Sequence, residues 1–479
     1  MLLALLVALG VAPLAAAPSM REPRAALDSR DARALANSFR QARADAPAWR
    51  RERDFAALLQ ALESLRSHGL MPADYQLATL RRLRSNHQAR DRIATEAWFA
   101  AAVDLLRGKV DPRRVEPDWT APAREADLPR LLASALANGE PAAALLSLAP
   151  THPEYRMLRA ALARLLADPA SSLPSSGPLP ASHPLHEEPF LTQLFRDARA
   201  SAASLTSSRA PRDEANLDTA ARIASLRASL ERWRWLPDDL GRRHVRVDIP
   251  AYRVTAYDGN RIVQRHRAIV GDADTRTPVF SDRIRYIVFN PWWETPRSIA
   301  VRDELPVFRR YPSAARVLGF QVLDAGGRRI DPDTIDWHEV SAAAFPYRLR
   351  QAPGPFNALG RAKIMFPNRH DVYLHDTAAP ELFLDTERTY SSGCVRTDGI
   401  ATLSAWLLAE TPQWSGRRVT DAMDGGRTIR ADLARPVPVH LLYFTAEPDP
   451  ARIDGEIRYL DDIYGRDPRL IDLLDRTPN

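Results

Sequence analysis

The only cysteine of the 479-residue chain, Cys394, follows the small residues Ser391-Ser392-Gly393. A lone cysteine is most often a small buried hydrophobic residue, but serine and glycine beside it predict a turn rather than a core. Arg396 follows two residues later, and His375 lies nineteen residues upstream. A thiol that has a base and a positive charge nearby can form an activated thiolate. The sequence therefore predicts a cysteine nucleophile that transfers acyl groups.

The candidate base lies on a predicted strand, 372–377. Residues two apart on a strand share a face, so Tyr373 and His375 point one way while Val372 and Leu374 point the other. If the second pair packs into the core, His375 is free to act on a substrate. A histidine satisfied within the core is the alternative when nothing else is known, and the Cys394 motif favours the catalytic interpretation.

The residues after Cys394 predict a helix that begins at Asp398, a good N-cap, with apolar residues at helical spacing behind it. A cysteine shortly before a helix start feels the positive end of the dipole, and Arg396 adds charge. Both effects favour thiolate. Gly393 allows close approach of the main chain to a carbonyl, so the N–H groups of Gly393 and Cys394 are candidate oxyanion donors. A buried, inert cysteine is the alternative.

These residues need a scaffold, and the pattern divides the chain in two. Apolar residues at helical spacing predict helices over 26–165, with a break at His68-Gly69-Leu70-Met71-Pro72. A segment rich in proline and serine follows from 168 and resists regular structure. Alternating patterns predict strands at 244–249 and 252–257, with a hairpin turn at Asp258-Gly259-Asn260. Residues 294–356 interrupt the strands and can act as a lid.

Composition limits the function classes. Hydrophobic residues make up 45% and charged residues 26%, as in ordinary globular proteins, and the net charge is only +6. No dense basic stripe stands out, which argues against nucleic-acid binding. Residues 1–17 are uncharged and end in Ala15-Ala16-Ala17, as in an export signal; an uncleaved membrane anchor is the alternative. An unpaired thiol in an oxidising compartment is notable as reactive.

Several motifs together resemble the L,D-transpeptidases, which carry a YkuD-type catalytic domain. The segments that carry the resemblance are Asn357-Ala358-Leu359-Gly360, Phe366-Pro367-Asn368, Tyr373-Leu374-His375-Asp376-Thr377 and Ser391-Ser392-Gly393-Cys394-Val395-Arg396. The fifteen residues between His375 and Ser391, 376–390, fit the family's spacing. The large periplasmic branch is indicated by Glu231–Pro237, Asn290–Trp293, Phe345–Arg348 and Asp461–Asp467.

The resemblance implies an α+β fold, in which an all-α scaffold domain precedes a mostly β catalytic domain of the YkuD-like sandwich type with a lid insertion. The expected divisions are a signal peptide (1–17), a helical scaffold (26–167), a Pro/Ser-rich linker (168–215), the catalytic domain (216–446, with the lid at 294–356) and a C-terminal extension (447–479). Relatives of this branch usually carry a peptidoglycan-binding module at the linker position, and its motifs are missing here. We hypothesise that this module has been lost.

The resemblance also implies an enzyme of the periplasm. Cys394 would attack the third residue of a tetrapeptide stem of peptidoglycan, release D-alanine and pass the acyl group to another stem as a 3→3 cross-link. His375 would be the base, oriented by a main-chain carbonyl near Asp376, and the drug class of the carbapenems would react with the same thiol. Neither a metal nor an organic cofactor is implied. Peptidoglycan stem peptides are the expected partners, and other cell-wall synthesis proteins stay open as partners.

The remaining site residues carried over by the resemblance have supporting roles. Gly393 and Ser392 form the oxyanion loop, and Ser392 stands where many relatives have a second histidine. Expected to bind substrate are Arg396, Tyr373, Asn357 and Trp293. Core packing is the alternative for Trp293, and a structural salt bridge is the alternative for Arg396.

Three other functions stay open at this stage. Water as acceptor would make the protein an L,D-carboxypeptidase, and a protein amine would make it a protein-anchoring acyltransferase; no motif marks the acceptor. A catalytically silent wall-binding scaffold is disfavoured because both His375 and Cys394 are present. Papain-like proteolysis would place the cysteine near the N-terminus and the histidine far downstream, the reverse of the order seen here.

Overall fold

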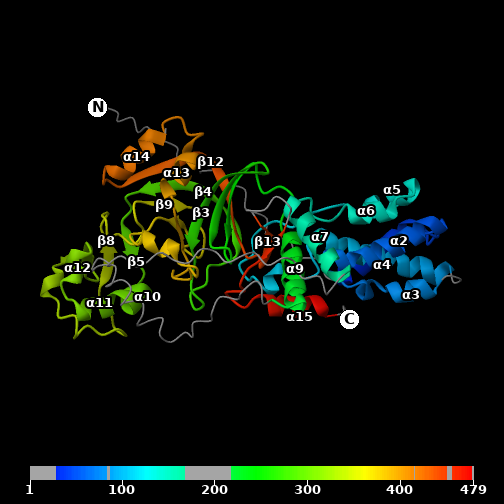
Figure 1. The fold of residues 1–479 in the computed structure, drawn as a ribbon, viewed down its shortest axis with the longest axis horizontal. Coiled ribbons are helices and arrows are strands. Elements are labelled where there is room, and N and C mark those ends of the chain that lie inside the picture. Colours follow the sequence, from blue (N-terminus) through cyan, green and yellow to red (C-terminus); the bar gives the residue numbers. More distant parts are fainter. Residues whose placement is uncertain (1–28, 84–86, 168–216, 415, 450–455, 477–479) are drawn as a thin grey trace, which may run out of the picture.

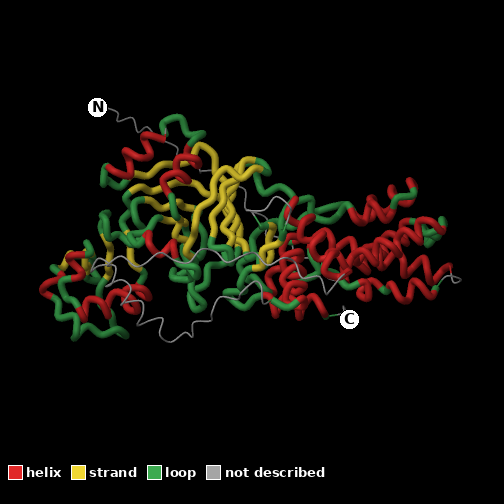
Figure 2. The backbone as a smooth tube through the Cα atoms, in the orientation of Figure 1, coloured by secondary structure: helices red, strands yellow, loops and turns green. Residues whose placement is uncertain are grey.

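The computed structural model describes residues 29–83, 87–167, 217–414, 416–449 and 456–476. A helical region, a strand-rich region and a smaller mixed region follow one another along the long axis of the molecule (Figure 1). Figure 2 shows the same division, with helices gathered at one end and strands in the middle. The predicted signal peptide and the predicted linker, and with it the hypothesis of a lost module, lie outside the described residues. Within the described ranges, none of the helices has the length and apolar character needed to cross a membrane.

The helical region encloses α4 (His87–Arg107). Buried side chains occur around this helix from Ile93 to Leu106, as expected for a helix surrounded by others. The predicted break after His68 is present, because Gly69 takes a φ of +78° and ends a short 3-10 turn. The other helices here are α1 (Ser29–Ala42), α2 (Glu52–Ser64), α3 (Leu77–Arg82), α5 (Leu128–Asn138), α6 (Pro141–Leu146) and α7 (Pro153–Ala167), with 3-10 turns at Leu65–His68, Pro72–Tyr75 and Pro112–Arg114.

Helix α9 (Thr219–Arg234) connects the helical and strand-rich regions. Asp218 caps it, since its Oδ1 accepts the Ala221 N–H at 2.7 Å. The helix packs against both α7 and the C-terminal helix α15 (Asp467–Asp475). Leu158 and Leu162 of α7 share one hydrophobic core with α9 and the strands, whereas α1 to α6 have a core of their own. Helix α7 thus anchors the scaffold on the strand-rich region.

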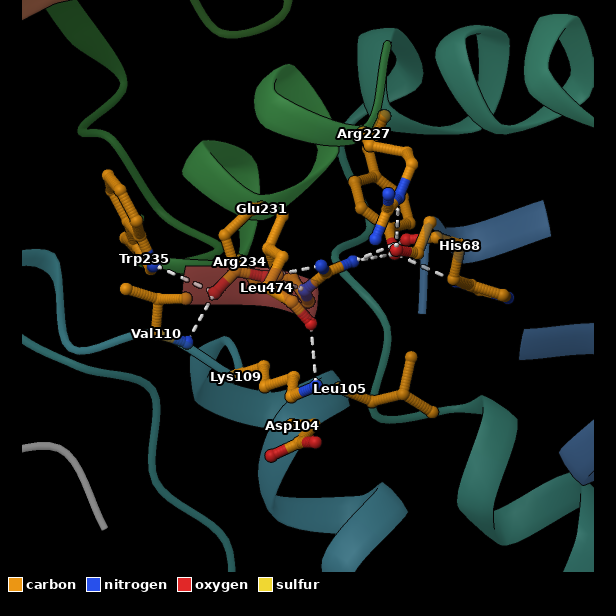
Figure 3. A network of polar contacts seen from close by, with 12 residues as sticks. His68, Asp104, Leu105, Lys109, Val110, Arg227, Glu231, Arg234, Trp235 and Leu474 are labelled. Atoms are coloured by element: carbon orange, nitrogen blue, oxygen red, sulfur yellow. Dashed lines mark hydrogen bonds and ion pairs between the residues drawn. The ribbon is translucent and has the colours of Figure 1, made fainter. Parts of the chain in front are cut away.

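Buried charges on α9 tie these parts together (Figure 3). Glu231 and Arg234 are both fully buried and form an ion pair. Glu231 also accepts hydrogen bonds from the Val110 N–H at 2.7 Å and from the Trp235 indole at 3.2 Å. Arg234 donates to the main-chain carbonyl of His68 at 2.7 Å. Removal of either charge would leave the other buried without compensation.

Lys109 extends this cluster toward the C-terminus. Its Nζ lies 2.7 Å from the Asp74 carboxylate. It also lies 2.6 Å from the main-chain carbonyl of Leu474 in α15 (Figure 3). We call Glu231, Arg234, His68, Lys109 and Asp74 the junction network. Each charged member has a charged partner, so the network fixes the scaffold, α9 and α15 relative to one another.

The strand-rich region is a closed barrel with the strand order β1-β12-β4-β9-β10-β11-β3-β2. The pairs β1–β12 and β10–β11 are parallel. The predicted hairpin forms between β2 and β3, and it turns at Gly259-Asn260. The strands are β1 (Arg243–Asp248), β2 (Arg253–Asp258), β3 (Arg261–Ile269), β4 (Phe280–Phe289), β9 (Ala362–Met365), β10 (Leu374–His375), β11 (Val395–Thr397) and β12 (Ile429–Leu442), and the associated helices are the 3-10 turn Pro380–Leu384, α13 (Ile400–Leu408) and α14 (Gly416–Asp424).

The predicted insertion, 294–356, forms a separate unit at the far end of the molecule from the scaffold (Figure 1). Its four-stranded sheet has the order β5-β8-β6-β7, and its apolar residues form their own core around Phe308 and Trp337. The elements are β5 (Trp293–Thr295), α10 (Arg297–Ile299), the π-helical turn Ala300–Glu304, α11 (Leu305–Arg310), α12 (Ala314–Val317), β6 (Phe320–Leu323), β7 (Arg329–Ile330), the 3-10 turn Pro332–Thr334 and β8 (Arg348–Gln351).

The C-terminal extension returns to the barrel and to α9. Strand β13 (Ala446–Pro448) pairs with β14 (Ile457–Tyr459), and α15 follows. Tyr464, between β14 and α15, reaches the barrel loop that contains Gly271 and Thr277. Its hydroxyl donates to the Gly271 carbonyl at 2.7 Å and accepts the Thr277 N–H at 3.1 Å. The extension is thus part of the support of the strand-rich region.

The prediction of an α+β chain, with a helical scaffold before a strand-rich domain, is confirmed. The strands differ from the expected sandwich because they close into a barrel: β12 pairs with β1 on one side and with β4 on the other, which leaves no free edge there. The prediction of Asp398 as a helix N-cap is wrong. Its N–H pairs with the Arg267 carbonyl of β3, and α13 begins at Ile400 after Gly399, which takes a φ of +62°.

Candidate active site

Three adjacent barrel strands bring the candidate residues to one surface. Ile364 of β9, Leu374 of β10 and Val395 of β11 are fully buried in the barrel core. Because side chains alternate along a strand, their neighbours face outward. The outward-facing set, which we call the reactive face, consists of Lys363, Tyr373, His375, Cys394 and Arg396.

The register of these strands places His375 between two positive side chains. Its backbone pairs with Lys363 on β9 and with Arg396 on β11. Cys394 directly precedes β11, and the N–H of Val395 donates to the Tyr373 carbonyl at 3.1 Å, so Cys394 comes alongside Tyr373. Strand pairing thus brings together two side chains that lie nineteen positions apart in the sequence.

Cys394 is half-buried and is held by main-chain contacts. Its Sγ donates to the Asp371 carbonyl at 3.6 Å, and Asp371 takes a φ of +52°, a left-handed conformation that costs a non-glycine residue energy. Burial raises the pKa of the Cys394 thiol to about 11, although contacts from Tyr373 and the charge of Arg396 oppose this shift. The resting residue is therefore a thiol at neutral pH, and the predicted resting thiolate is not supported.

The helix dipole does not offset the rise in the pKa of Cys394 that burial causes. Strand β11 lies between Cys394 and α13, so the nucleophile is not at a helix N-terminus. The prediction that it feels the dipole is wrong, because the dipole acts only within the first turn.

His375 is buried and neutral. Burial lowers the pKa of its ring to about 3, and the charges of Arg396 and Lys363 add to this effect. The main chain of Asp376 opposes the shift, as the resemblance implied for an orienting carbonyl, but Nδ1 makes no contact of hydrogen-bond geometry within the described residues. The His375 and Tyr373 rings meet in a T-shaped arrangement, with their centroids 5.7 Å apart. A neutral imidazole ring can accept a proton.

The loop before Cys394 is fixed from below. Gly393 takes a φ of +108°, which favours glycine, and its carbonyl accepts the Thr277 hydroxyl at 2.9 Å. Its N–H donates to the Ser391 hydroxyl at 3.1 Å. In this conformation the Gly393 N–H is engaged, and its predicted role as an oxyanion donor would require the Ser391 hydroxyl to turn away. The Cys394 N–H stays the candidate donor.

The insertion touches this loop directly. Arg302, in the π-helical turn, donates to the Ser392 hydroxyl at 2.6 Å and also pairs with Asp303 at 2.7 Å. π-helical turns are rare and often occur at functional sites. Tyr373 packs against the core of the insertion as well as that of the barrel. The predicted lid therefore contacts the loop before Cys394 at Ser392 and the reactive face at Tyr373.

Two predicted substrate-binding residues lie in the interior. The Asn357 amide is buried and donates to the carbonyls of Pro291 at 3.0 Å and Ala352 at 2.9 Å, while its Oδ1 accepts the Leu359 N–H at 2.9 Å. Trp293 is buried in the core of the insertion. These contacts join the insertion to the barrel, and substrate binding by either residue stays a prediction without support from its position.

Sequence analysis missed Lys363, Asp371 and Arg302, and it named Asn368 only as part of a family motif. Asn368 shapes the loop after β9: its side chain donates to the carbonyls of Phe366 and Val372, each at 2.7 Å. A signal for Lys363 was present, because a lysine between the apolar residues Ala362 and Ile364 marks an outward position on a buried strand. The Arg302 contact joins segments ninety residues apart and has no local signal.

Comparison with known proteins agrees with the division into a helical region and a strand-rich region. Residues 242–420 match a family described as the L,D-transpeptidase catalytic domain, and residues 34–162 match one described as a Scaffold domain. A curated Haemophilus influenzae protein named "Putative L,D-transpeptidase" is 34% identical over 245 residues, which are 51% of this chain and 48% of that protein. The match thus spans about half the length of that relative. Among solved structures, the match to L,D-transpeptidase 1 of Mycobacterium tuberculosis covers 42% of this chain and 61% of the other, with 11% identity and a TM-score of 0.17.

Proposed function

Residues 242–420 belong to the L,D-transpeptidase catalytic domain family, and on that premise we propose that the chain is a peptidoglycan L,D-transpeptidase. It forms 3→3 cross-links through an acyl-enzyme on Cys394 and releases D-alanine from tetrapeptide stems. The periplasm, where peptidoglycan is assembled, is its proposed compartment.

The first half-reaction is acylation. His375 removes the thiol proton as the sulfur of Cys394 attacks the carbonyl carbon of the third stem residue. The tetrahedral intermediate then collapses, the proton passes from His375 to the departing nitrogen, and D-alanine leaves as the carbon–nitrogen bond breaks. A neutral imidazole is needed for the first of these steps, and the low pKa of His375 keeps it neutral at pH 7.

The second half-reaction transfers the acyl group. The side-chain amine of a diamino acid in another stem attacks the thioester, His375 accepts the amine proton, and the sulfur leaves and recovers a proton. Because the pKa of the Cys394 thiol is raised, its proton moves with the attack in the first half-reaction rather than before it.

One observation carries the proposal: His375 on β10 and Cys394, the residue just before the parallel strand β11, lie on the same outward face, and Cys394 is partly exposed. An inert structural cysteine would be expected inside the barrel, where Val395 lies. The direct contact of the insertion with Ser392 adds a surface that could close over a bound stem.

Incubation of the full-length protein with a disaccharide tetrapeptide, followed by mass spectrometry of the products, tests the proposal. Cross-linked dimers accompanied by free D-alanine are expected, and the Cys394→Ala variant should yield neither. Tripeptides without dimers would favour an L,D-carboxypeptidase. Attachment to an added protein amine would favour an anchoring enzyme. Unchanged tetrapeptide with wild-type protein would favour a silent wall-binding scaffold and overturn the proposal.

A further inference from the structure

The chain contains only two lysines, and they have opposite surroundings. Lys109 belongs to the junction network, where a carboxylate and a main-chain carbonyl hold its ammonium group. Lys363 lies on the reactive face and is half-buried, and within the described residues no carboxylate reaches ion-pair distance of its Nζ. Its Nζ instead lies 5.4 Å from the centroid of the Tyr373 ring.

Such a position is costly for a lysine if it serves stability alone. Partial burial disfavours the ammonium form and lowers the pKa of Lys363. The carboxylate of Glu294 on β5 acts on it from a distance, but Glu294 pairs with Arg348 at 3.7 Å. An apolar side chain would cover Tyr373 without this desolvation cost, so the charge itself points to an anion that forms or binds nearby.

The anion that the proposed reaction creates lies on the same face. Lys363 pairs in register with His375, and Cys394 is close enough for its thiolate charge to act on the Lys363 ammonium. His375 cannot act as a permanent counter-ion because it is neutral. Arg396 on the same face also acts on the sulfur, but it is buried, whereas Lys363 has a flexible stem and partial exposure.

We propose that Lys363 is a positioning residue that acts through Cys394: its ammonium group, opposite His375 and over the Tyr373 ring, stabilises the negative charge that forms on the sulfur during acylation. The inference deepens the proposed function and rests on it, because the charge on the sulfur forms in the proposed acylation. The groups that share this field are His375 on β10 and Tyr373 just before it, Arg396 on β11 and Cys394 just before it, Asp371 in the loop before β10, and Glu294 on β5.

The single cysteine makes a direct test available, since iodoacetamide can alkylate no other thiol. The pH profile of the alkylation rate reports the pKa of Cys394 in the full chain, without any peptidoglycan substrate. Loss of one nearby unit charge at an effective dielectric between protein and water is worth about one pKa unit. At pH 7, where the Lys363 ammonium is charged, Lys363→Met is therefore expected to slow alkylation about tenfold. Near the pKa of Cys394, about 11, the wild-type lysine has lost its proton and the two rates should converge.

Two further variants separate charge from structure. Lys363→Arg keeps the charge and is expected to keep the alkylation rate at pH 7 close to that of the wild type. Arg242→Met removes an exposed charge next to β1, on the opposite side of the barrel in strand order, and is expected to change nothing. The readout is the rate at pH 7 divided by the plateau rate at high pH, because altered access to the sulfur changes both rates equally. Thermal melting identifies a variant that has not folded.

An unchanged ratio of the two rates in folded Lys363→Met, or an equal fall in Lys363→Arg, would overturn the inference. Because alkylation does not depend on turnover, a protein that cross-links nothing can still show the change. In that case the proposed function fails while the electrostatic role of Lys363 stands. Cross-linking by wild-type protein together with an unchanged ratio gives the reverse outcome.

Discussion

Two buried histidines with the same low pKa, about 3, lie in two differently built regions. His68 in the junction network uses both ring nitrogens: Nδ1 is 2.8 Å from the Tyr155 hydroxyl and Nε2 is 3.3 Å from Arg159. His375 on the reactive face leaves Nδ1 without a partner among the described residues. Both rings are neutral because burial disfavours the charge, so the pKa alone does not distinguish structure from function.

The lysines repeat the contrast. Lys109 is neutralised within the protein, and Lys363 is not. Buried polar groups normally have partners, so each exception needs an explanation. In the junction network the groups satisfy one another and hold three parts of the chain together. On the reactive face several groups have hydrogen-bonding or charge-pairing capacity that the described residues do not use, and a bound substrate could use it.

Replacement of the two histidines should break this comparison most strongly. His375→Gln removes the base and is expected to slow acylation of Cys394 by about 10²–10⁴-fold. His68→Gln leaves the reactive face intact, so the acylation rate of the folded protein should stay near that of the wild type. Rates of carbapenem acylation followed by intact mass check both. Equal losses in the two variants would mean that His375 has no special role.

A variant of the junction network should show the converse behaviour. Glu231→Gln leaves the fully buried Arg234 without its counter-charge, and the free energy of unfolding is expected to fall by about 3–5 kcal/mol. Urea unfolding measures this. The pH dependence of the rate at which iodoacetamide alkylates Cys394 in the folded protein should not change. Asp432→Asn, which breaks an exposed ion pair with Arg430, is the matched control and should leave stability unchanged.

The smallest effect is expected where the insertion meets the nucleophile loop. Arg302→Ala removes the hydrogen bond to Ser392, which is partly exposed, so Cys394 should become about two- to fivefold more reactive toward iodoacetamide as the insertion loosens. Arg316→Ala removes another exposed arginine of the insertion, one that pairs with Asp331 and Asp333, and serves as the control. A rate below that of the wild type in Arg302→Ala would contradict a closing contact.

Local patterns predicted the parts of the site that depend on neighbours in sequence. The strand alternation around Leu374 placed His375 on the outward side, and the small residues before Cys394 predicted its turn. The division into helical and strand-rich regions followed from the periodicity of the apolar residues.

The failures involve partners that are distant in the chain. Asp398 has good capping chemistry, but pairing with Arg267 of β3 extends the strand and delays the helix. Closure of the barrel depends on β12 pairing with β1, about 190 residues upstream, which no local pattern records. Asn357 belongs to a family motif, yet its amide donates to the main-chain carbonyls of Pro291, before the insertion, and Ala352, inside it.

Intact-mass measurement after incubation with a carbapenem, whose strained ring makes it an acyl donor, tests the nucleophile most directly. The wild-type protein should gain the mass of one drug molecule, and fragmentation should place it on Cys394. The Cys394→Ala variant, folded as judged by thermal melting, should gain nothing. An adduct of similar yield in that variant would mean that the acyl group is carried elsewhere and that the reactive face has been assigned the wrong chemistry.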